Sequence, residues 1–347
     1  MAPSRRPPRG DPRRPSALRR AAGVVATLAL VAGALAGAWL YYFTHTPLAL
    51  PAVPYSFTVH PGSSLKTVAR QLSADGVLAE PYSFWLLGRA GGKAGAIQAG
   101  TYRLDKPVTP PELLDKLARG DVVLVEVLFV EGTTLKQWLT QLELNPEVKH
   151  TLEGKGEPEL RAILGLDQPV EGWLFPDTYR FTPGIADVDI LKRAYAAMKK
   201  RLADAWAARD PQLPLKSPYE ALILASIVEK ETGQAAERPL IASVFVNRMR
   251  LGMRLQTDPT VIYGLGDKYD GRIHKRDLTT DTPWNTYTRD GLPPTPIAMP
   301  GAASLRAAVQ PAQTSYLYFV GRGDGTHEFS RTLEEHNRAV AKYQLGQ

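Results

Sequence analysis

The feature that most constrains this chain is an uncharged run of 23 residues from Ala21 to Phe43, which reads AAGVVATLALVAGALAGAWLYYF. About 20 apolar residues are enough to cross the hydrocarbon core of a bilayer as a helix. The first twenty residues are strongly basic, since they hold seven arginines and one acidic residue. Because positively charged flanks stay in the cytoplasm, we expect a cytoplasmic tail at residues 1–20, a single transmembrane helix at residues 21–43 and an exported body.

A cleaved signal peptide is the alternative interpretation of this N-terminus. Ala34, Leu35 and Ala36 resemble the small-residue site at which such peptides are cut. The apolar run is longer than a usual signal-peptide core, however, and it continues beyond that site. We therefore expect a retained anchor.

Of the net charge of +7, the N-terminal tail of residues 1–20 carries +6. Residues 21–347 carry 35 basic and 34 acidic side chains, so the body of the protein is nearly neutral. Nucleic-acid-binding domains carry a basic patch or stripe, and this balance argues against one. The chain has no cysteine, and at this length the exported body can bury enough apolar surface without disulfides.

Residues 44–54 contain three prolines and no charged residue, which predicts a stiff extended stalk. Beyond it, two segments follow the same pattern: residues 59–72 read VHPGSSLKTVARQL, and residues 130–142 read VEGTTLKQWLTQL. Each predicts a strand, a turn and a helix that is capped by a hydroxyl side chain. Thr134 and Gln137 fit a capping box. The first helix shows a buried stripe at helical spacing, formed by Leu65, Val68, Ala69 and Leu72. Whether the two segments share ancestry or are only a recurring unit stays open.

The rest of the chain predicts a mixed α+β fold. A short strand is expected within Val122–Val130, and helices are expected at about 134–144, 187–207, 217–232, 236–251 and 331–345. Residues 283–301 are rich in proline and glycine and predict a long ordered loop. Regular alternation of strands and helices is missing, which favours α+β over α/β.

The segment YEALILASIVEKET, residues 219–232, carries the candidate catalytic residue. On a helix with about 100° between residues, Glu231 falls on the same apolar arc as Ile227 and Val228. Glu229 falls on the other side, beside Ser226 and Lys230. Burial raises the pKa of a carboxyl group, and a raised pKa suits a general acid near neutral pH. The alternative is that Glu231 is an exposed residue in the last turn, as most glutamates are.

Two further segments could contact a sugar. In NRMRLGMRLQTDPTVIYG, residues 247–264, Asp258 before Pro259 predicts a helix N-cap, whereas Gln256 has no capping role and is the better ligand candidate. In TPWNTYTRDGLPPTPIAMPG, residues 282–301, Trp284 and Tyr287 could stack on sugar faces and Asn285 could hydrogen-bond a hydroxyl or acetamido group. A rigid structural lid is the alternative for this second segment.

The sequence lacks the residue patterns that are typical of other kinds of catalytic or binding site. The six histidines show no spacing typical of metal ligands, and the sequence has no P-loop and no G-x-S-x-G motif. His327 and His336 are interpreted as structural or exposed. We expect no metal and no cofactor.

Several segments together resemble the YceG-like family of endolytic murein transglycosylases. The likeness rests on ASIVEKET (225–232), ASVFVNRMRLGMRLQTDPTVIYG (242–264), NTYTRDGLPP (285–294), EGWLFPDTYRF (171–181) and EHNRAV (335–340), and it runs from about residue 55 to the end. Residues 55–121 also resemble a LysM-like module, a small β-α-α-β unit that binds glycans containing N-acetylglucosamine. The chain departs from the family pattern at Trp284, Thr295 and Met299.

The resemblance implies an enzyme that cuts inside peptidoglycan strands at the MurNAc-GlcNAc bond and leaves 1,6-anhydroMurNAc ends. It implies Glu231 as the catalytic residue, a YceG-like catalytic domain at residues 122–347 and a role in ending nascent strands in the inner membrane, near penicillin-binding proteins. The substrate-binding candidates in the two segments are Asn247, Gln256, Thr257, Asp258, Tyr263, Asn285 and Tyr287. The alternatives are a non-catalytic, membrane-anchored glycan-binding scaffold and a lysozyme-type hydrolase that uses water as the acceptor.

Overall fold

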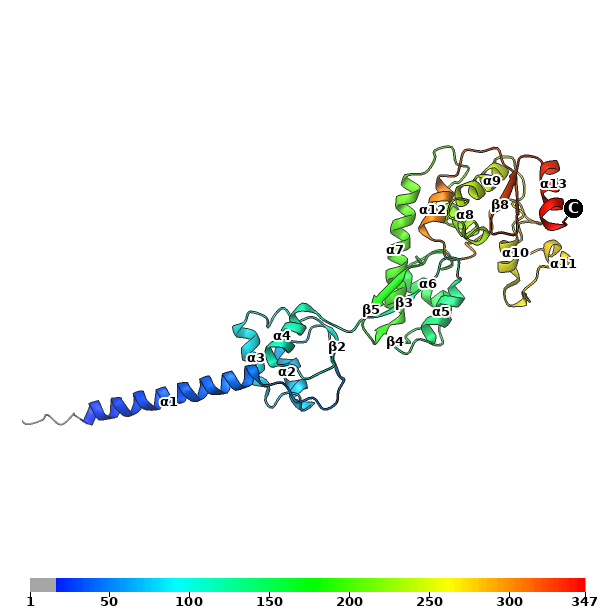
Figure 1. The fold of residues 1–347 in the computed structure, drawn as a ribbon. Coiled ribbons are helices and arrows are strands. Elements are labelled where there is room, and N and C mark those ends of the chain that lie inside the picture. The colour runs from blue at the N-terminus through cyan, green and yellow to red at the C-terminus, as the bar shows by residue number, and fades with distance from the viewer. Residues whose placement is uncertain (1–16, 347) are drawn as a thin grey trace, which may run out of the picture. The chain divides into compact units, whose positions relative to one another are not determined.

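The computed structural model describes residues 17–346, and their helices and strands form a mixed α+β fold, as predicted (Figure 1). Most of the predicted cytoplasmic tail, residues 1–16, lies outside the described residues. The chain divides into two compact units, residues 1–123 and residues 124–347. Each unit has its own apolar core.

The first unit begins with α1 (Ala17–His45), which from Ala21 to His45 is long and apolar enough to cross a membrane. This property fits either a membrane span or a signal sequence. The side chains from residue 21 to residue 42 are exposed in the isolated protein, as a lipid-facing surface would be. The helix therefore has no protein core of its own to explain its apolar character.

The remainder of this unit has β-α-α-β order followed by a further helix. Strand β1 (Tyr55–Val59) pairs antiparallel with β2 (Gly100–Leu104). The helices are α2 (Leu65–Ala74), α3 (Pro81–Ala90) and α4 (Pro110–Arg119). Ser64 caps α2 through a hydrogen bond from the amide of Thr67, and the predicted stripe from Leu65 to Leu72 is buried. The predicted periodicity is confirmed.

The second unit starts with short strands and two helices. Strand β3 (Val125–Leu128) pairs antiparallel with β5 (Thr178–Phe181), and β4 (Val148–Lys149) pairs parallel with β6 (Ile185–Ala186). Helices α5 (Leu135–Glu143) and α6 (Glu157–Leu164) lie between them in sequence. The capping box predicted for Thr134 and Gln137 is present at the start of α5. Trp138 of α5 is fully buried against Phe129, with their ring centroids 3.8 Å apart.

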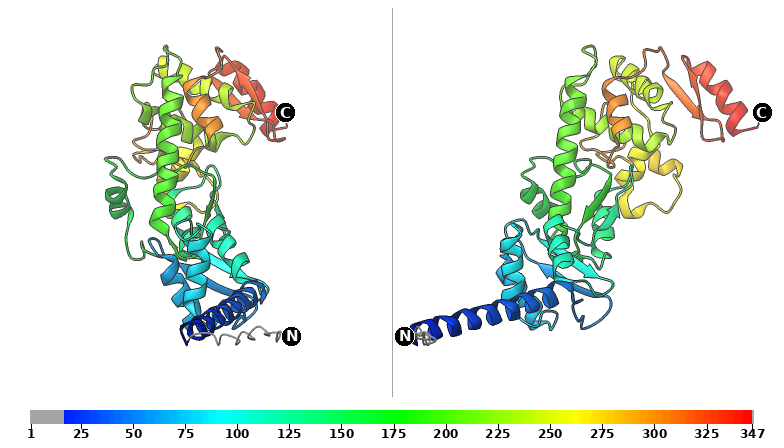
Figure 2. Two further views of the ribbon diagram at one scale, coloured as in Figure 1. Left: turned by 90° about the vertical axis from the view of Figure 1, so that its left-hand side faces the viewer. Right: turned by 60° about the vertical axis from the view of Figure 1, so that its left-hand side comes forward.

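The main core of the second unit surrounds α8 (Pro218–Glu231). Its neighbours are α7 (Asp187–Ala207), α9 (Arg238–Arg250), α10 (Asp258–Leu265) and α12 (Ala302–Val309). Figure 2 shows α12, in orange, close to the long green helix α7. Residues 221–228 of α8 are all buried, because other helices and the loop before α12 cover every side of it.

This arrangement corrects the prediction that α8 has a wet side. Ser226 is fully buried, and its hydroxyl accepts a hydrogen bond from the amide of Ile297. The side chain of Glu229 is only 4% exposed and pairs with Arg238 at 3.0 Å. Periodicity could not reveal this burial, because the covering residues lie about 70 positions further along the chain.

The remaining elements complete the second unit. They are the short helix η1 (Gly266–Lys268), helix α11 (Lys275–Thr279), the hairpin of β7 (Tyr318–Gly321) and β8 (His327–Ser330), and α13 (Leu333–Gln344), which packs on that hairpin. No helix or strand occurs between Thr279 and Ala302, so the predicted ordered loop is confirmed. Figure 2 shows the hairpin and α13 in red as one group.

Candidate functional site

Glu231 is the last residue of α8, and its carboxyl group opens into a pocket of about 430 Å³. One wall of this pocket comes from α9 and from residues 255–258, which lead into α10. The other comes from β7, β8 and α13. The pocket therefore lies within the second unit and combines segments that are up to about 110 positions apart in sequence.

The carboxyl group of Glu231 is held by Thr257, whose hydroxyl donates a hydrogen bond to Oε1. Thr257 is itself fixed, because its amide donates to Oγ1 of Thr286 at 3.1 Å. Thr260 completes the cluster: its hydroxyl donates to the carbonyl of Thr257 at 2.7 Å and lies 2.9 Å from that of Thr286. These contacts determine the orientation of the carboxyl group before any substrate binds.

Burial raises the pKa of Glu231 to about 7. The hydrogen bond from Thr257 acts in the opposite direction, and the nearby charge of Asp258 raises the pKa further. His327 and Arg248 lower it by a smaller amount. A carboxyl group with this pKa is partly protonated at neutral pH, which is the condition for acting first as an acid and then as a base.

Four of the predicted substrate-binding residues line this pocket: Gln256, Thr257, Asp258 and Tyr287. Gln256 has a positive φ of 50°, which is uncommon for a residue other than glycine. Asp258 is not the N-cap that the sequence predicted. It is the first residue of α10, and its carboxylate accepts a hydrogen bond from the hydroxyl of Tyr287 at 2.6 Å.

The other three predicted substrate-binding residues lie elsewhere. The amide nitrogen of Asn247 donates to the carbonyls of Thr314 and Tyr316. Tyr263 donates to the buried carboxyl group of Glu171 at 3.2 Å. These contacts connect structural segments to one another and favour a structural role for both residues.

Asn285 is almost completely buried, with 1% of its surface exposed. Its amide nitrogen lies within 2.7–3.3 Å of three backbone carbonyls, and its oxygen accepts from the amide of Tyr287 at 2.9 Å. Every hydrogen-bonding group of this side chain is therefore used inside the protein. In the same loop, Trp284 donates to the hydroxyl of Thr295, so two of the departures from the family pattern contact each other.

Several pocket residues were missed by sequence reasoning. Arg248 is buried and donates to the carbonyls of Leu255 and Leu317. His327 and His336 also line the pocket, although the sequence suggested that both were structural or exposed. Arg248 and His336 lie in segments that carry the family resemblance, whereas His327 lies in none of them, and no local spacing connects these residues to Glu231.

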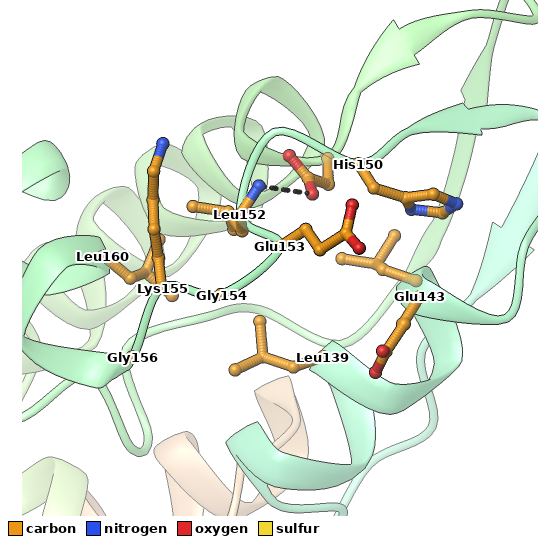
Figure 3. A pocket seen from close by; sticks show the side chains of 11 residues that line it. Leu139, Glu143, His150, Leu152, Glu153, Gly154, Lys155, Gly156 and Leu160 are labelled. Atoms are coloured by element: carbon orange, nitrogen blue, oxygen red, sulfur yellow. Dashed lines mark hydrogen bonds between the residues drawn. The ribbon is translucent and has the colours of Figure 1, made fainter.

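A second cavity of about 330 Å³ lies among α5, β4 and α6 (Figure 3). Leu139, Leu152 and Leu160 give it an apolar lining, and Glu153 also lines it. The amide of Leu152 donates to Asp187 at 3.0 Å, which is the contact that the dashed line marks. This cavity contains none of the predicted site residues, so the Glu231 pocket is the candidate active site.

Comparisons with known proteins agree on one family. The model of the YceG-like family matches residues 57–342. An endolytic murein transglycosylase of Bacillus subtilis (strain 168) is 31% identical over 300 residues, which cover 81% of this chain and 82% of that protein. A protein of the same name from Streptococcus pneumoniae serotype 2 is 28% identical over 282 residues, and the match spans about half (51%) of its length.

A solved structure is similar as well. The crystal structure of a YceG-like protein from Listeria monocytogenes matches with a TM-score of 0.54 and 31% sequence identity, covering 82% of this chain and 99% of that one. The match to the family model, residues 57–342, includes Glu231. This chain belongs to the YceG-like family.

Proposed function

We propose that this protein is a peptidoglycan lytic transglycosylase and that Glu231 is its acid/base residue. Membership of a family whose relatives are named endolytic murein transglycosylases supports the reaction class. The observation that carries the assignment to Glu231 is its carboxyl group, which lies in a pocket, is held by Thr257 and has a pKa of about 7.

The proposed reaction needs one carboxyl group in two roles. Protonated Glu231 donates its proton to the glycosidic oxygen between MurNAc and GlcNAc, and the bond from C1 of MurNAc to that oxygen breaks. The C6 hydroxyl of the same MurNAc then attacks C1, and its proton passes to the Glu231 carboxylate. The product is a 1,6-anhydroMurNAc end, and Glu231 is protonated again. Attack within one sugar avoids the entropic cost of recruiting a separate acceptor.

The pocket residues would hold the glycan in the geometry that this attack requires. Gln256 and Tyr287 present an amide and an aromatic ring to the pocket, which are groups that suit a sugar. Thr257 would keep the Glu231 carboxyl group aimed at the glycosidic oxygen. We assign Asn247, Tyr263 and Asn285 to the framework behind the pocket, on the basis of their internal hydrogen bonds.

A lysozyme-type hydrolase is the second candidate, because Asp258 places another carboxylate in the same pocket. Retaining glycosidases use such a pair, one as acid and one as nucleophile or electrostatic stabiliser. The hydroxyl of Tyr287 engages the Asp258 carboxylate, which reduces its strength as a nucleophile. We therefore favour transglycosylation.

We further propose that α1 anchors the enzyme in the inner membrane with the N-terminus in the cytoplasm. The basic N-terminal flank and the apolar stretch from Ala21 to His45 support this orientation. The β-α-α-β segment of the first unit would then bind glycan as a LysM-like module, close to the membrane surface. In that location the enzyme could end nascent strands as penicillin-binding proteins extend them.

The first test compares Glu231→Gln with Glu229→Gln, two identical changes on one helix. Glu231→Gln keeps the size of the side chain, but its amide cannot donate a proton as a carboxylic acid does. The variant should therefore release no 1,6-anhydro ends from purified peptidoglycan. Glu229→Gln should still release them at a temperature where it is folded. It should melt lower than wild type, because the buried Arg238 loses its charged partner. The measurement is mass analysis of the products, together with thermal melting of the full-length protein in detergent.

The outcomes separate the candidates. Anhydro ends from wild type and none from Glu231→Gln support the proposal. Reducing ends in place of anhydro ends from the wild-type protein would identify a hydrolase. Full activity in Glu231→Gln would show that the acid is another group.

A further inference from the structure

A histidine and a carboxylate form a pair beside the Glu231 pocket. Glu237 is at the N-cap position of α9, and His327 is the first residue of β8. Oε1 of Glu237 accepts a hydrogen bond from the backbone amide of His327 at 2.8 Å, and Oε2 lies 2.7 Å from Nδ1 of the ring. Both side chains are mostly buried, with 13% of Glu237 and 15% of His327 exposed. The ring is therefore held in one orientation.

The pair determines which ring nitrogen carries the hydrogen. Burial by itself would raise the pKa of Glu237, but the hydrogen bonds from the side chain and backbone of His327 outweigh it and hold that pKa below its usual range. An ionised carboxylate can only accept hydrogen bonds, so Nδ1 of His327 must carry a hydrogen. In the neutral ring, Nε2 then has a free lone pair.

The free nitrogen belongs to a ring that lines the Glu231 pocket. Within residues 17–346, Nε2 of His327 makes no hydrogen bond and is not among the buried polar atoms that lack a partner, which means that it is accessible. Phe319 packs edge-on to the ring, with centroids 5.4 Å apart. The ring is thus fixed by Glu237 and Phe319 and leaves Nε2 free to hydrogen-bond a ligand.

The same carboxylate connects this ring to the end of α8. Thr232, the residue after Glu231, donates from its hydroxyl to Oε2 of Glu237 at 3.3 Å. The hydroxyl of Thr232 in turn accepts from the amide of Gln234 at 2.9 Å. Glu231 and His327 are therefore positioned against one another through a short chain of contacts, although they lie 96 residues apart in sequence.

Several other polar groups of the pocket are already engaged. Thr257 donates to Glu231, and Tyr287 donates to Asp258. Arg248 donates to backbone carbonyls and to the side chain of Gln256. Glycan hydroxyls both donate and accept hydrogen bonds, so a fixed and accessible ring nitrogen is well suited to contact one of them.

We propose that His327 is a substrate-contacting residue, which hydrogen-bonds a glycan hydroxyl through Nε2, and that Glu237 is the residue that positions it. The proposal rests on the proposed function, because it takes the Glu231 pocket as the glycan site. A purely structural link between β8 and α9 through the same pair is the competing explanation. The two differ in whether Nε2 matters.

The substitution His327→Asn distinguishes a substrate contact from a purely structural link. In His327→Asn, the side-chain nitrogen replaces Nδ1 and can still donate to Glu237, but nothing replaces Nε2. We expect the full-length variant to melt close to wild type and to lose roughly 10- to 100-fold in kcat/KM on soluble, uncrosslinked peptidoglycan strands, the scale on which a lost transition-state contact is felt. The matched control is His274→Asn. His274 also pairs with a carboxylate, Asp277 at 3.3 Å, but it is not among the residues that line the Glu231 pocket. This control should keep wild-type kinetics.

A second pair of variants covers the case in which His327→Asn is unstable. The amide of His327→Gln reaches the position of Nε2, whereas His327→Ala leaves it empty, and neither keeps the contact with Glu237. Per folded molecule, the glutamine variant should retain several-fold more activity than the alanine variant.

The activities of wild type and Glu231→Gln test the proposed function separately. When wild type is active and Glu231→Gln is inactive, each result for the His327 variants decides for or against this proposal. Loss of kcat/KM in a stable His327→Asn, or a glutamine variant more active than the alanine variant, supports the proposal. A stable His327→Asn with wild-type kcat and KM would overturn it, and so would equal activity of the glutamine and alanine variants.

Discussion

At the scale of single residues, the pKa of Glu231 couples the activity of the protein to its stability. The folded protein binds a proton on Glu231 up to a pH of about 7, whereas the unfolded chain releases it near the ordinary value of 4.5. Between these values the folded state holds more protons than the unfolded state, so the free energy of unfolding falls as the pH rises. A shift of this size corresponds to at most about 3 kcal/mol.

This coupling predicts a pH-dependent gain in stability for Glu231→Gln. At pH 5 the carboxyl group of the folded wild type is protonated and the variant should melt close to it. At pH 8 the wild type must keep a buried carboxylate, whereas the variant has none, and the variant should melt several degrees higher. Thermal melting of both proteins across this range measures the difference. The same difference at pH 5 and pH 8 would contradict the raised pKa.

Glu171 also makes the stability of the protein depend on pH, so the effect of Glu231 must be measured as the difference between wild type and Glu231→Gln. Burial also raises the pKa of this carboxyl group to about 7, against the hydrogen bonds from Leu135 and Tyr263. Its contribution to the pH dependence has the same sign as that of Glu231. Because Glu171 is present in both proteins, it cancels in the difference between wild type and Glu231→Gln.

At the scale of elements, the loop from Thr280 to Gly301 is a framework that positions the pocket. The amide nitrogen of Asn285 hydrogen-bonds three backbone carbonyls at the end of α11. Its oxygen accepts a hydrogen bond from the amide of Tyr287, a pocket residue. Thr286 holds Thr257, which holds Glu231. The loop therefore acts on the carboxyl group of Glu231, the proposed acid/base, through a series of hydrogen bonds.

The contrast between Asn285 and Gln256 tests this division of roles. Asn285→Ala leaves buried carbonyls without donors, which should cost roughly 2–4 kcal/mol of stability. Activity should then fall in parallel with the folded fraction. Gln256→Asn tolerates the positive φ and withdraws the amide from the pocket, so it should keep its melting temperature and lose activity. Melting curves and product release are measured for both. A stable but inactive Asn285→Ala would indicate that Asn285 binds substrate, as the sequence predicted.

At the scale of the whole molecule, the orientation in the membrane determines whether the enzyme reaches its substrate. In the proposed topology, residues 21–43 are the anchor and the basic tail is in the cytoplasm, so everything after the predicted stalk lies outside. An exported-only reporter enzyme fused after Gln347 should therefore be active, whereas a reporter that works only in the cytoplasm should be silent. The reverse pattern would contradict the topology, and a mature protein that lacks residues 1–36 would indicate a signal peptide.

The sequence by itself determined the local features of this protein. The bounds of the five helices predicted between residues 134 and 345, the capping box at Thr134 and the buried stripe on α2 depend on neighbours within one or two turns. The helix bounds were predicted to within two residues, and the capping box and the stripe are confirmed. The apolar run at residues 21–43 could be identified because its length and composition are sufficient for a membrane span or a signal sequence. Glu231 was singled out by its place on α8 and by resemblance to the family.

Only the tertiary structure decided which residues share the pocket. Periodicity placed Glu229 in water, but α12, Arg238 and the loop at Gly301 bury it. Asp258, assigned as a cap, contacts Tyr287 instead, and Asn285, chosen for its amide, uses every donor and acceptor internally. His327 reaches the Glu231 pocket from 96 positions away. The physical reason is the same in each case: burial and hydrogen-bond partners come from segments distant in sequence, and no local pattern records which of those segments will pack together.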